Sequence, residues 1–171
     1  MIWIIGCILA VAAIFALTVL RGAPYVPSHH SEAKAAFDEL YNLSSSDVLV
    51  DVGSGDGIIL RLASRKGSHA VGYELNPILV FISRFLSRGD KNVSVTLTDF
   101  WVKDIPDDTT IIYAFVVTRD VEKLERKLQR EANRLDRSLY LMTYGAGLKH
   151  MKEHKVRRGH RLYRFNPLQE K

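Results

Sequence analysis

Acidic residues beside closely spaced glycines are the chemically most informative feature of the sequence. An apolar run ends at Asp51, and glycines then occupy every second position of residues 53–57. Glycine lets a backbone turn sharply and approach a ligand without a Cβ in the way. A second apolar run ends at Glu74. Because an acidic residue at such a strand end binds ribose hydroxyls in dinucleotide folds, the two segments together predict a site for a cofactor that contains adenosine.

Two classes of adenosine cofactor fit this loop to different degrees. The dinucleotide fingerprint has the spacing G-x-G-x-x-G, whereas this loop has G-x-G-x-G with Asp56 inside it. Asp51 and Asp56 would repel a pyrophosphate bound at a helix N-terminus. S-adenosylmethionine carries a sulfonium, an ammonium and one carboxylate, so acidic neighbours suit it better. We therefore favour S-adenosylmethionine over a dinucleotide and over a glycine-rich turn that binds nothing.

The elements that must position this loop alternate between strand and helix. Apolar and β-branched runs predict strands at residues 48–52, 69–73, 93–97, 110–117 and 138–144. Helical periodicity lies between them, at residues 58–66, 78–88 and 120–135, and a terminal hairpin is expected within 155–165. This order predicts an α/β fold: a Rossmann-like, doubly wound, mostly parallel seven-stranded sheet with an antiparallel C-terminal edge, preceded by one transmembrane helix.

The transmembrane helix is expected because residues 2–20 contain no charged side chain. A helix of this length spans roughly 28 Å, close to the thickness of a bilayer core. We expect residues 1–21 to form an uncleaved single-pass anchor in the lipid bilayer, residues 22–30 a proline-containing connector, and residues 31–171 the main domain. The positive-inside tendency then predicts a membrane location with this domain on the cytoplasmic or an equivalent side. A cleaved signal peptide is the alternative, but a basic leader and a small-x-small cleavage site are not evident.

Composition excludes several kinds of chemistry. The single cysteine, Cys7, lies in the uncharged segment, so the main domain has no cysteine nucleophile and no thiolate metal site. Cytosine-C5 methylation, which proceeds through a cysteine adduct, is therefore excluded. The six histidines show no metal-ligand spacing, and no metal is expected. The net charge of +5 is concentrated in residues 149–171, which hold eight Lys or Arg against two Glu; anionic headgroups, nucleic acid and solvent alone remain possible partners of this basic end.

Five segments together resemble one known family. They are residues 24–28 (PYVPS), 51–57 (DVGSGDG), 71–77 (VGYELNP), 98–101 (TDFW) and 121–128 (VEKLERKL). They are similar to the class I S-adenosylmethionine-dependent methyltransferases, and in particular to the small membrane-anchored protein-lysine methyltransferases known from mitochondria. Members of that family methylate a lysine of the adenine nucleotide translocase or of the ATP synthase membrane ring. The resemblance covers about residues 1–140, and the short chain suggests a prokaryotic relative.

The resemblance implies S-adenosyl-L-methionine as cofactor and a lysine in a membrane or membrane-proximal protein as acceptor. The residues expected to bind the cofactor are Asp51, Gly53, Ser54, Gly55, Asp56, Gly57, Glu74, Leu75, Asn76, Asp99 and Phe100. Residues 142–148 (MTYGAGL) depart from the family's arginine- and proline-rich segment at this place, so its substrate-facing wall cannot be transferred to this chain.

Three residues are candidates for the catalytic step: Asp99, Tyr25 and Trp101. In-line transfer needs a neutral amine about 3 Å from the methyl carbon, and Asp99 or Tyr25 would help the lysine to lose its proton. Trp101, Tyr25 and Tyr144 are candidates for an aromatic wall, since cation–π attraction tolerates growing methylation. Ordinary core packing is the alternative for each of these aromatic side chains.

Other functions stay open to different degrees. Adenine-N6 methyltransferases carry an Asn/Asp-Pro-Pro-aromatic element after the fourth strand, and residues 115–120 (FVVTRD) lack it, so a nucleic-acid partner is not expected. Methylation of a lipid, a small molecule or RNA remains an alternative. So does a non-catalytic assembly factor that binds S-adenosylmethionine.

Overall fold

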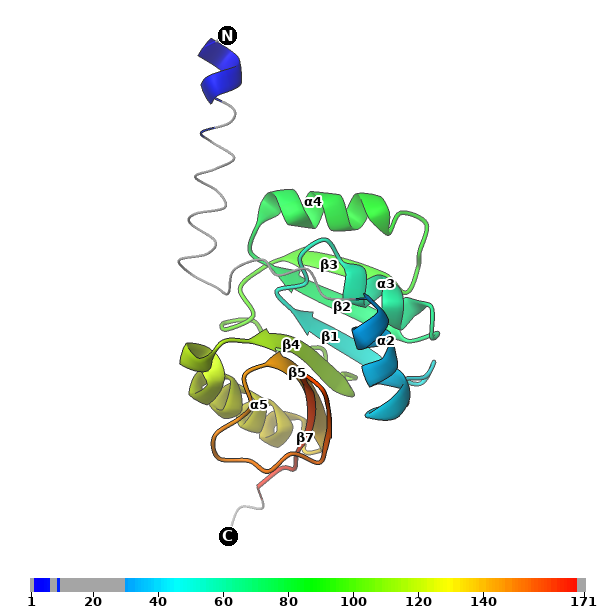
Figure 1. The fold of residues 1–171 in the computed structure, drawn as a ribbon, viewed down its shortest axis with the longest axis vertical. Helices are drawn as coiled ribbons and strands as arrows, with labels where there is room; N and C mark the ends of the chain where they lie inside the picture. Colours follow the sequence, from blue (N-terminus) through cyan, green and yellow to red (C-terminus); the bar gives the residue numbers. More distant parts are fainter. Residues whose placement is uncertain (1, 7–8, 10–29, 169–171) are drawn as a thin grey trace.

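A mixed β-sheet organises the chain (Figure 1). The computed structural model describes residues 2–6, 9 and 30–168. Its strands are β1 (Val48–Val52), β2 (His69–Glu74), β3 (Val93–Leu97), β4 (Ile111–Val116), β5 (Leu139–Gly145), β6 (Lys155–Arg157) and β7 (His160–Phe165). Its helices are α2 (His30–Glu39), α3 (Ile58–Ser64), α4 (Pro77–Leu86) and α5 (Val121–Leu135), with a short 3-10 helix, η1 (Thr118–Asp120), before α5.

The strand order confirms the predicted sheet. Within residues 30–168 seven strands lie in the order β3-β2-β1-β4-β5-β7-β6. Strands β1 to β5 pair in parallel, while β7 pairs antiparallel with both β5 and β6. The chain builds outward from β1 in one direction and then returns to add β4 on the other side of it. Ligands bind in open α/β sheets at such a switch point, outside the carboxyl ends of the strands.

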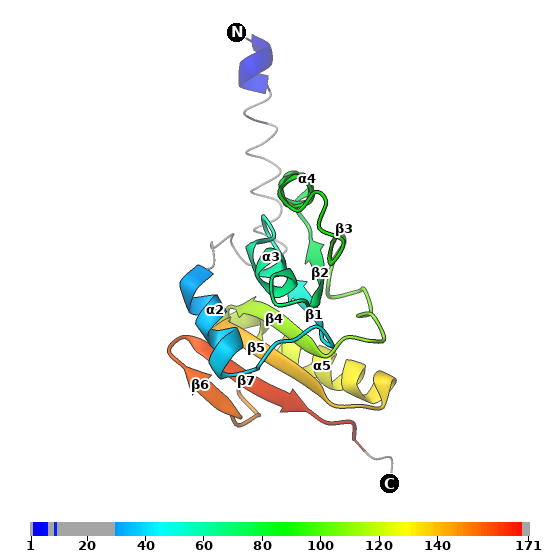
Figure 2. The same ribbon diagram turned by 90° about the vertical axis from the view of Figure 1, so that its right-hand side faces the viewer.

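Helices cover both faces of the sheet (Figure 2). Helices α2, α3 and α4 share one hydrophobic core, to which they contribute Phe37, Leu60 and Val80. Helix α5 packs on the opposite face, where Leu124 and Leu128 are buried. The two cores hold the parallel strands between them, as expected for strands that are apolar on both faces.

Local sequence determines where α4 begins. Asn76 is its N-cap, and the Asn76 side chain accepts hydrogen bonds from the backbone N–H groups of Ile78 and Leu79. Pro77 occupies the first helical position, where its missing N–H costs nothing. Since β2 ends at Glu74, a single residue, Leu75, separates Glu74 from the cap residue Asn76.

The predicted membrane anchor is corrected by the structure. Among residues 2–6, 9 and 30–168, no helix has the length and apolar character needed to cross a membrane, so the expected single-pass anchor and the membrane location that depended on it are wrong for the part of the chain described. The expectation rested on the length and the uncharged character of residues 2–20, whereas a bilayer is crossed by a continuous helix of about 20 residues. Residues 7–8 and 10–29, which include most of the expected anchor and Tyr25, lie outside the described residues.

Candidate functional site

The glycine loop joins β1 to α3 at the carboxyl edge of the sheet. Gly53, Gly55 and Gly57 all have positive φ, at 72°, 55° and 80°. Residues with a Cβ rarely adopt this conformation, which explains the alternate glycines. The N–H groups of Gly53 and Ser54 donate to the Tyr73 carbonyl at 2.9 and 3.1 Å, so the loop is fixed to β2. A Cβ built on Gly53 would meet no atom within 4 Å, so the backbone there borders open space that a ligand can enter.

Asp51 is a buried carboxylate without a partner in the part of the chain that the structure describes. It is 4% exposed, and among the described residues its side chain makes no hydrogen bond or ion pair. Burial raises the pKa of Asp51 well above its usual value of 3.8, and the negative charges of Glu74 and Asp56 raise it further. An isolated ionised carboxylate is expensive to bury. The site therefore favours a ligand that brings positive charge to this position.

Glu74, by contrast, is a buried carboxylate with three backbone partners. Its Oε2 accepts from the Gly55 N–H at 2.8 Å, and its Oε1 accepts from the N–H groups of Leu75 and Asn76 at 2.8 Å each. Glu74 thus joins the glycine loop to the turn before α4. An ionised carboxylate has about four acceptor positions, so one position is left for a further donor such as a ribose hydroxyl.

The other predicted residues of the loop region differ in their partners. Asp56 receives hydrogen bonds from Arg61 and from the Ile58 N–H, and its carboxylate lies 3.4 Å from the Arg61 guanidinium. Ser54 Oγ and Asn76 Nδ2 are buried and have no hydrogen-bond partner among residues 2–6, 9 and 30–168. These unpartnered polar atoms lie on the same two segments as Asp51 and Glu74. Polar groups of this kind are rare in folded proteins and are consistent with a ligand site.

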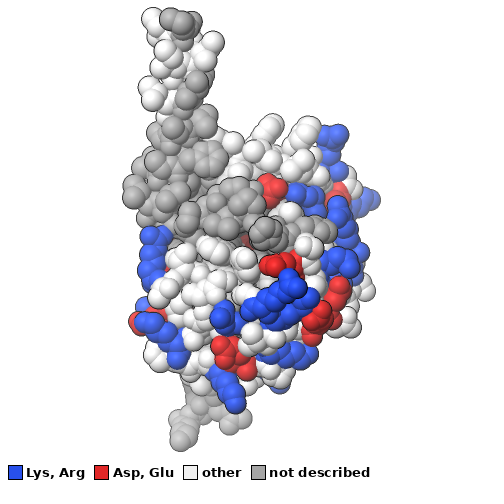
Figure 3. Space-filling model, viewed as in Figure 1, with Lys and Arg blue, Asp and Glu red and all other residues white. Residues whose placement is uncertain are grey.

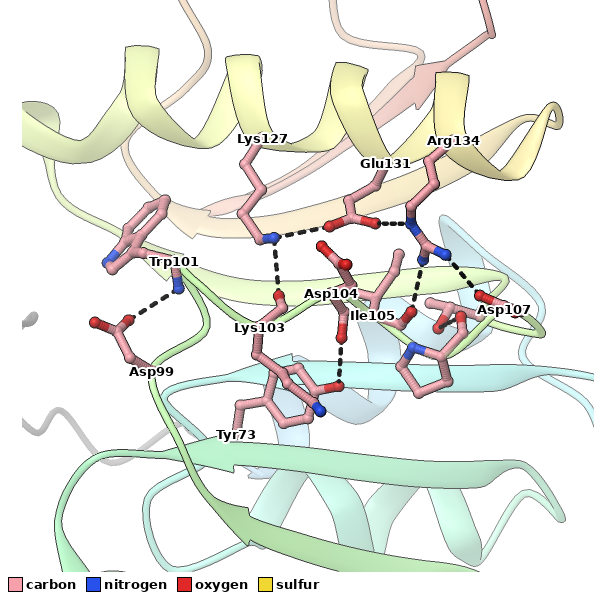
Figure 4. Close-up of polar contacts among 12 residues, drawn as sticks. Tyr73, Asp99, Trp101, Lys103, Asp104, Ile105, Asp107, Lys127, Glu131 and Arg134 are labelled. Atoms are coloured by element: carbon pink, nitrogen blue, oxygen red, sulfur yellow. Dashed lines mark hydrogen bonds and ion pairs between the residues drawn. The ribbon is translucent and has the colours of Figure 1, made fainter.

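Asp99 and Trp101 follow β3 at the same edge of the sheet (Figure 4), with Phe100 between them in the sequence. Asp99 Oδ1 accepts from the Trp101 N–H at 2.9 Å, which closes a tight turn. Phe100 is 4% exposed and packs between Tyr73 and Trp101, with ring centroids 6.5 and 5.4 Å away. The structure therefore places Phe100 mainly in the core, while the half-buried Asp99 carboxylate stays accessible.

Helix α5 holds the loop after Trp101 through a buried ionic network that the sequence analysis did not identify (Figure 4). Lys127 Nζ donates to the Lys103 carbonyl at 2.9 Å and to Glu131 Oε1 at 2.7 Å. Arg134 Nε donates to Glu131 Oε2 at 2.8 Å, and its Nη2 donates to the Ile105 carbonyl at 2.7 Å. The spacing i, i+4, i+7 of the three charged residues on one helix face is the signal that could have indicated this network.

A second group of residues lies in β4, β5 and β7, and sequence reasoning had identified only its Tyr144 member. The His160 ring stacks near Tyr144, with ring centroids 4.8 Å apart, and His160 Nε2 lies 3.1 Å from the Tyr113 hydroxyl. His160 Nδ1 is buried without a partner. Burial lowers the pKa of His160 below 6.5; the charge of Arg157 lowers it further, while that of Glu32 opposes this effect. Tyr113 of β4 pairs in register with Asp51 of β1, so this group lies next to the residues that are expected to bind the cofactor.

The structure does not bring the predicted aromatic wall together. Tyr144 packs against the core that α2 and α3 cover, whereas Trp101 packs against the core on the α5 face. Lys123 Nζ lies over the Trp101 ring, 4.1 Å from its centroid. Trp101 and Tyr144 are therefore on opposite faces of the sheet, and Tyr25 is not among the described residues.

Relatives in other organisms decide the family. A protein-lysine N-methyltransferase of Saccharolobus islandicus is 30% identical over 115 residues, which are 63% of this chain and 69% of that protein. The ATP synthase c-subunit lysine N-methyltransferase of Xenopus laevis is 36% identical over 127 residues, 71% of this chain and 55% of that protein. The chain belongs to the protein-lysine N-methyltransferase family. This confirms the predicted resemblance, with S-adenosylmethionine as the cofactor of the family.

The structural comparison agrees on the fold. An RNA methyltransferase from Salinibacter ruber, solved with S-adenosyl-L-homocysteine, matches 85% of this chain and 97% of that chain with a TM-score of 0.73. At 23% identity this likeness shows the fold alone. No protein-family model matches the chain. The chain spans about half the length of the ATP synthase methyltransferases of Xenopus laevis and Homo sapiens, 55% and 53% respectively.

Proposed function

We propose that this protein transfers a methyl group from S-adenosylmethionine to a lysine side chain of a protein. The observation that carries the proposal is the buried, unpartnered Asp51 carboxylate beside a loop of positive-φ glycines. This arrangement suits a cofactor with an ammonium and a sulfonium and disfavours a pyrophosphate. Membership of a family whose relatives are named protein-lysine N-methyltransferases supports lysine as the acceptor.

The cofactor would lie across the carboxyl ends of β1, β2 and β3. In this proposal Asp51 and the N–H groups of the glycine loop meet the methionine end. Glu74 offers its remaining acceptor position to the ribose, and Leu75 and Asn76 border the ribose and adenine. Asp99 accepts from the adenine amino group or from the target amine.

The chain contributes binding and orientation. When bound, S-adenosylmethionine supplies an activated methyl group on its sulfonium. The acceptor lysine must present a neutral amine in line with that group. Asp99 Oδ1 is held by the Trp101 N–H, which leaves Oδ2 to accept a hydrogen bond from the amine. If the Asp99→Asn variant keeps both cofactor affinity and full turnover, this role for Asp99 is wrong.

The test is transfer of tritiated methyl groups from S-adenosylmethionine to proteins. The Xenopus laevis relative is named for its action on the ATP synthase c-subunit. The purified c-subunit and a total protein extract are therefore the first acceptors to try. We expect label on lysine with the wild-type chain and loss of label with Glu74→Ala. Label that appears only in lipid, RNA or small molecules would contradict the assignment to protein lysine.

A further inference from the structure

A basic hollow lies between the loop after β3 and the first half of α5. Its volume is about 350 Å³, and it is lined by Trp101, Lys123, Arg126, Lys127 and Arg130. Figure 3 shows Lys and Arg side chains at the edge of the molecule where Figure 1 draws the start of α5. The family resemblance assigns no role to the four cations, which all come from one helix.

Lys127 is paired with the buried Glu131, but the positive charge of the three exposed cations of this hollow is only weakly neutralised. Lys123, Arg126 and Arg130 are exposed and lie at i, i+3 and i+7 on one face of α5. Arg126 approaches Glu122 to 4.0 Å, and that carboxylate lies closer to Lys149, at 2.8 Å. Arg130 makes no hydrogen bond or ion pair with any residue of the described part of the chain. Such a surface attracts an anionic partner.

The hollow is adjacent to the proposed reaction site. Lys127, its buried member, donates to the Lys103 carbonyl and so holds the loop that begins at Asp99. Trp101 contributes its ring to the hollow and its N–H to the Asp99 carboxylate. A chain bound in the hollow would therefore lie against the residues that we propose to meet the adenine or the target amine.

We propose that this hollow binds an acidic segment of the protein substrate, close in sequence to the lysine that is methylated. This inference rests on the proposed function. The row from Lys123 to Arg130 is about 10 Å long, since an α-helix rises 1.5 Å per residue. Same-side residues of an extended peptide lie roughly 7 Å apart, so the row accommodates two or three carboxylates.

The surroundings of Trp101 favour a peptide over a nucleic acid as the ligand of the hollow. Proteins that bind single strands stack bases on open aromatic faces. Here Lys123 Nζ covers one face of the Trp101 ring, and Phe100 contacts the ring at a centroid distance of 5.4 Å and an interplanar angle of 63°. One face of the ring is thus covered by a cation, and the short row of cations offers no long track for a phosphate backbone.

Tryptophan fluorescence of the full-length chain tests this proposal. The sequence has two tryptophans, Trp3 and Trp101, so a Trp3→Phe background makes Trp101 the reporter for the hollow. We expect a short polyglutamate peptide in about 0.1 M salt to change this fluorescence. The double variant Lys123→Glu/Arg130→Glu should weaken the peptide at least about tenfold, because two attractive charges become repulsive.

The matched control is Arg88→Glu/Lys91→Glu, which makes the same change in net charge after the end of α4. It should leave peptide affinity within about twofold of the parent, since exposed charges separated by more than about 10 Å are screened at 0.1 M salt. Equal weakening by both double variants would show attraction by net charge alone and overturn the proposal. So would an oligouridylate of equal charge that binds more tightly than polyglutamate and loses its affinity with Lys123→Glu/Arg130→Glu.

Cofactor binding separates this inference from the proposed function. S-adenosylhomocysteine should bind the Lys123→Glu/Arg130→Glu variant as well as it binds the parent chain. Cofactor binding by the parent without any peptide binding overturns the acidic-segment proposal alone. Failure of the parent to bind the cofactor overturns the proposed function itself. With a protein acceptor in hand, the variant should raise KM and leave kcat unchanged, because its lost contacts serve binding and not the reacting atoms.

Discussion

Asp51 and Glu131 are both buried carboxylates, but their surroundings are opposite. Glu131 is fully buried and lies between Lys127, at 2.7 Å, and Arg134, at 2.8 Å. Asp51 is 4% exposed and has no partner within the described protein. A buried charge that is fully paired fixes structure, and its loss is strongly destabilising. A buried acid whose pKa is raised and which lacks a partner is characteristic of a functional site.

Replacement of Glu131 should have the largest effect on stability. Glu131→Gln removes the negative charge that Lys127 and Arg134 share, and Lys127 is only 3% exposed. Breaking a buried ion pair on one side costs about 3 kcal/mol or more. We expect urea unfolding to show this loss in the free energy of unfolding. A loss below about 0.5 kcal/mol would mean that the network is not a structural support.

Replacement of Glu74 should give an intermediate result, because this residue has both backbone partners and a proposed ligand contact. Glu74→Gln keeps one acceptor oxygen for Leu75 and Asn76, but it places the side-chain NH2 group, a donor, opposite the Gly55 N–H, which is also a donor. An unsatisfied buried donor costs about 1–3 kcal/mol. We expect both the free energy of unfolding and the affinity for S-adenosylhomocysteine to fall. An effect on neither quantity would contradict the contact with Gly55.

The pH dependence of stability should distinguish Asp51 from the paired acids. Burial, Glu74 and Asp56 raise the pKa of Asp51 in the folded chain. Between 3.8 and this raised pKa, the folded state binds more protons than the unfolded state, so the free energy of unfolding falls as the pH rises. Asp51→Asn removes this contribution. Compared with Asp51→Asn, the wild-type chain without cofactor should lose stability with rising pH over this window.

Carboxylates with partners set the opposite trend and serve as the control. Hydrogen bonds from Tyr41 and Ser44 outweigh burial and lower the pKa of Asp47. Asp47 therefore adds stability that is present above its unfolded pKa and is lost as the pH falls through its folded pKa. An Asp47→Asn variant should lose stability relative to the wild type as the pH rises. Urea titrations at several pH values would measure both differences, and the same sign for both would contradict the contrast.

An exposed ion pair of α5 should show the smallest effect. Arg126 and Glu122 lie 4.0 Å apart with exposed side chains. Pairs of this kind contribute about 0–1 kcal/mol. We expect Arg126→Gln to change the free energy of unfolding by less than about 0.5 kcal/mol in the same urea assay. A larger change would show that exposure is a poor guide to the role of charges in this helix.

The part of the site that could be predicted from sequence is the part that local chemistry encodes. Strands β1 and β3 have the predicted bounds, and α4 begins at Pro77, one residue before the predicted start. The glycines of the loop have the positive φ values that their spacing indicates. These features depend on a few neighbouring residues, so the sequence states them directly.

The features that were missed depend on contacts between distant segments. Lys127 and Arg134 meet backbone carbonyls of residues 103 and 105, and His160 meets Tyr113 across the sheet. Trp101 and Tyr144 were grouped by residue type, but the loop after β3 packs Trp101 against one core and β5 packs Tyr144 against the other. Register and packing determine such matters, and a single sequence does not display them.

Calorimetric titration of S-adenosylmethionine into the full-length chain and into Asp51→Asn tests the central claim most directly. If Asp51 is a partner for a cationic cofactor, the wild type binds one equivalent, and the variant binds at least about tenfold more weakly, or about 1.4 kcal/mol, without loss of stability. Equal affinity of the two chains, or binding of NADH but not of S-adenosylmethionine, would contradict it.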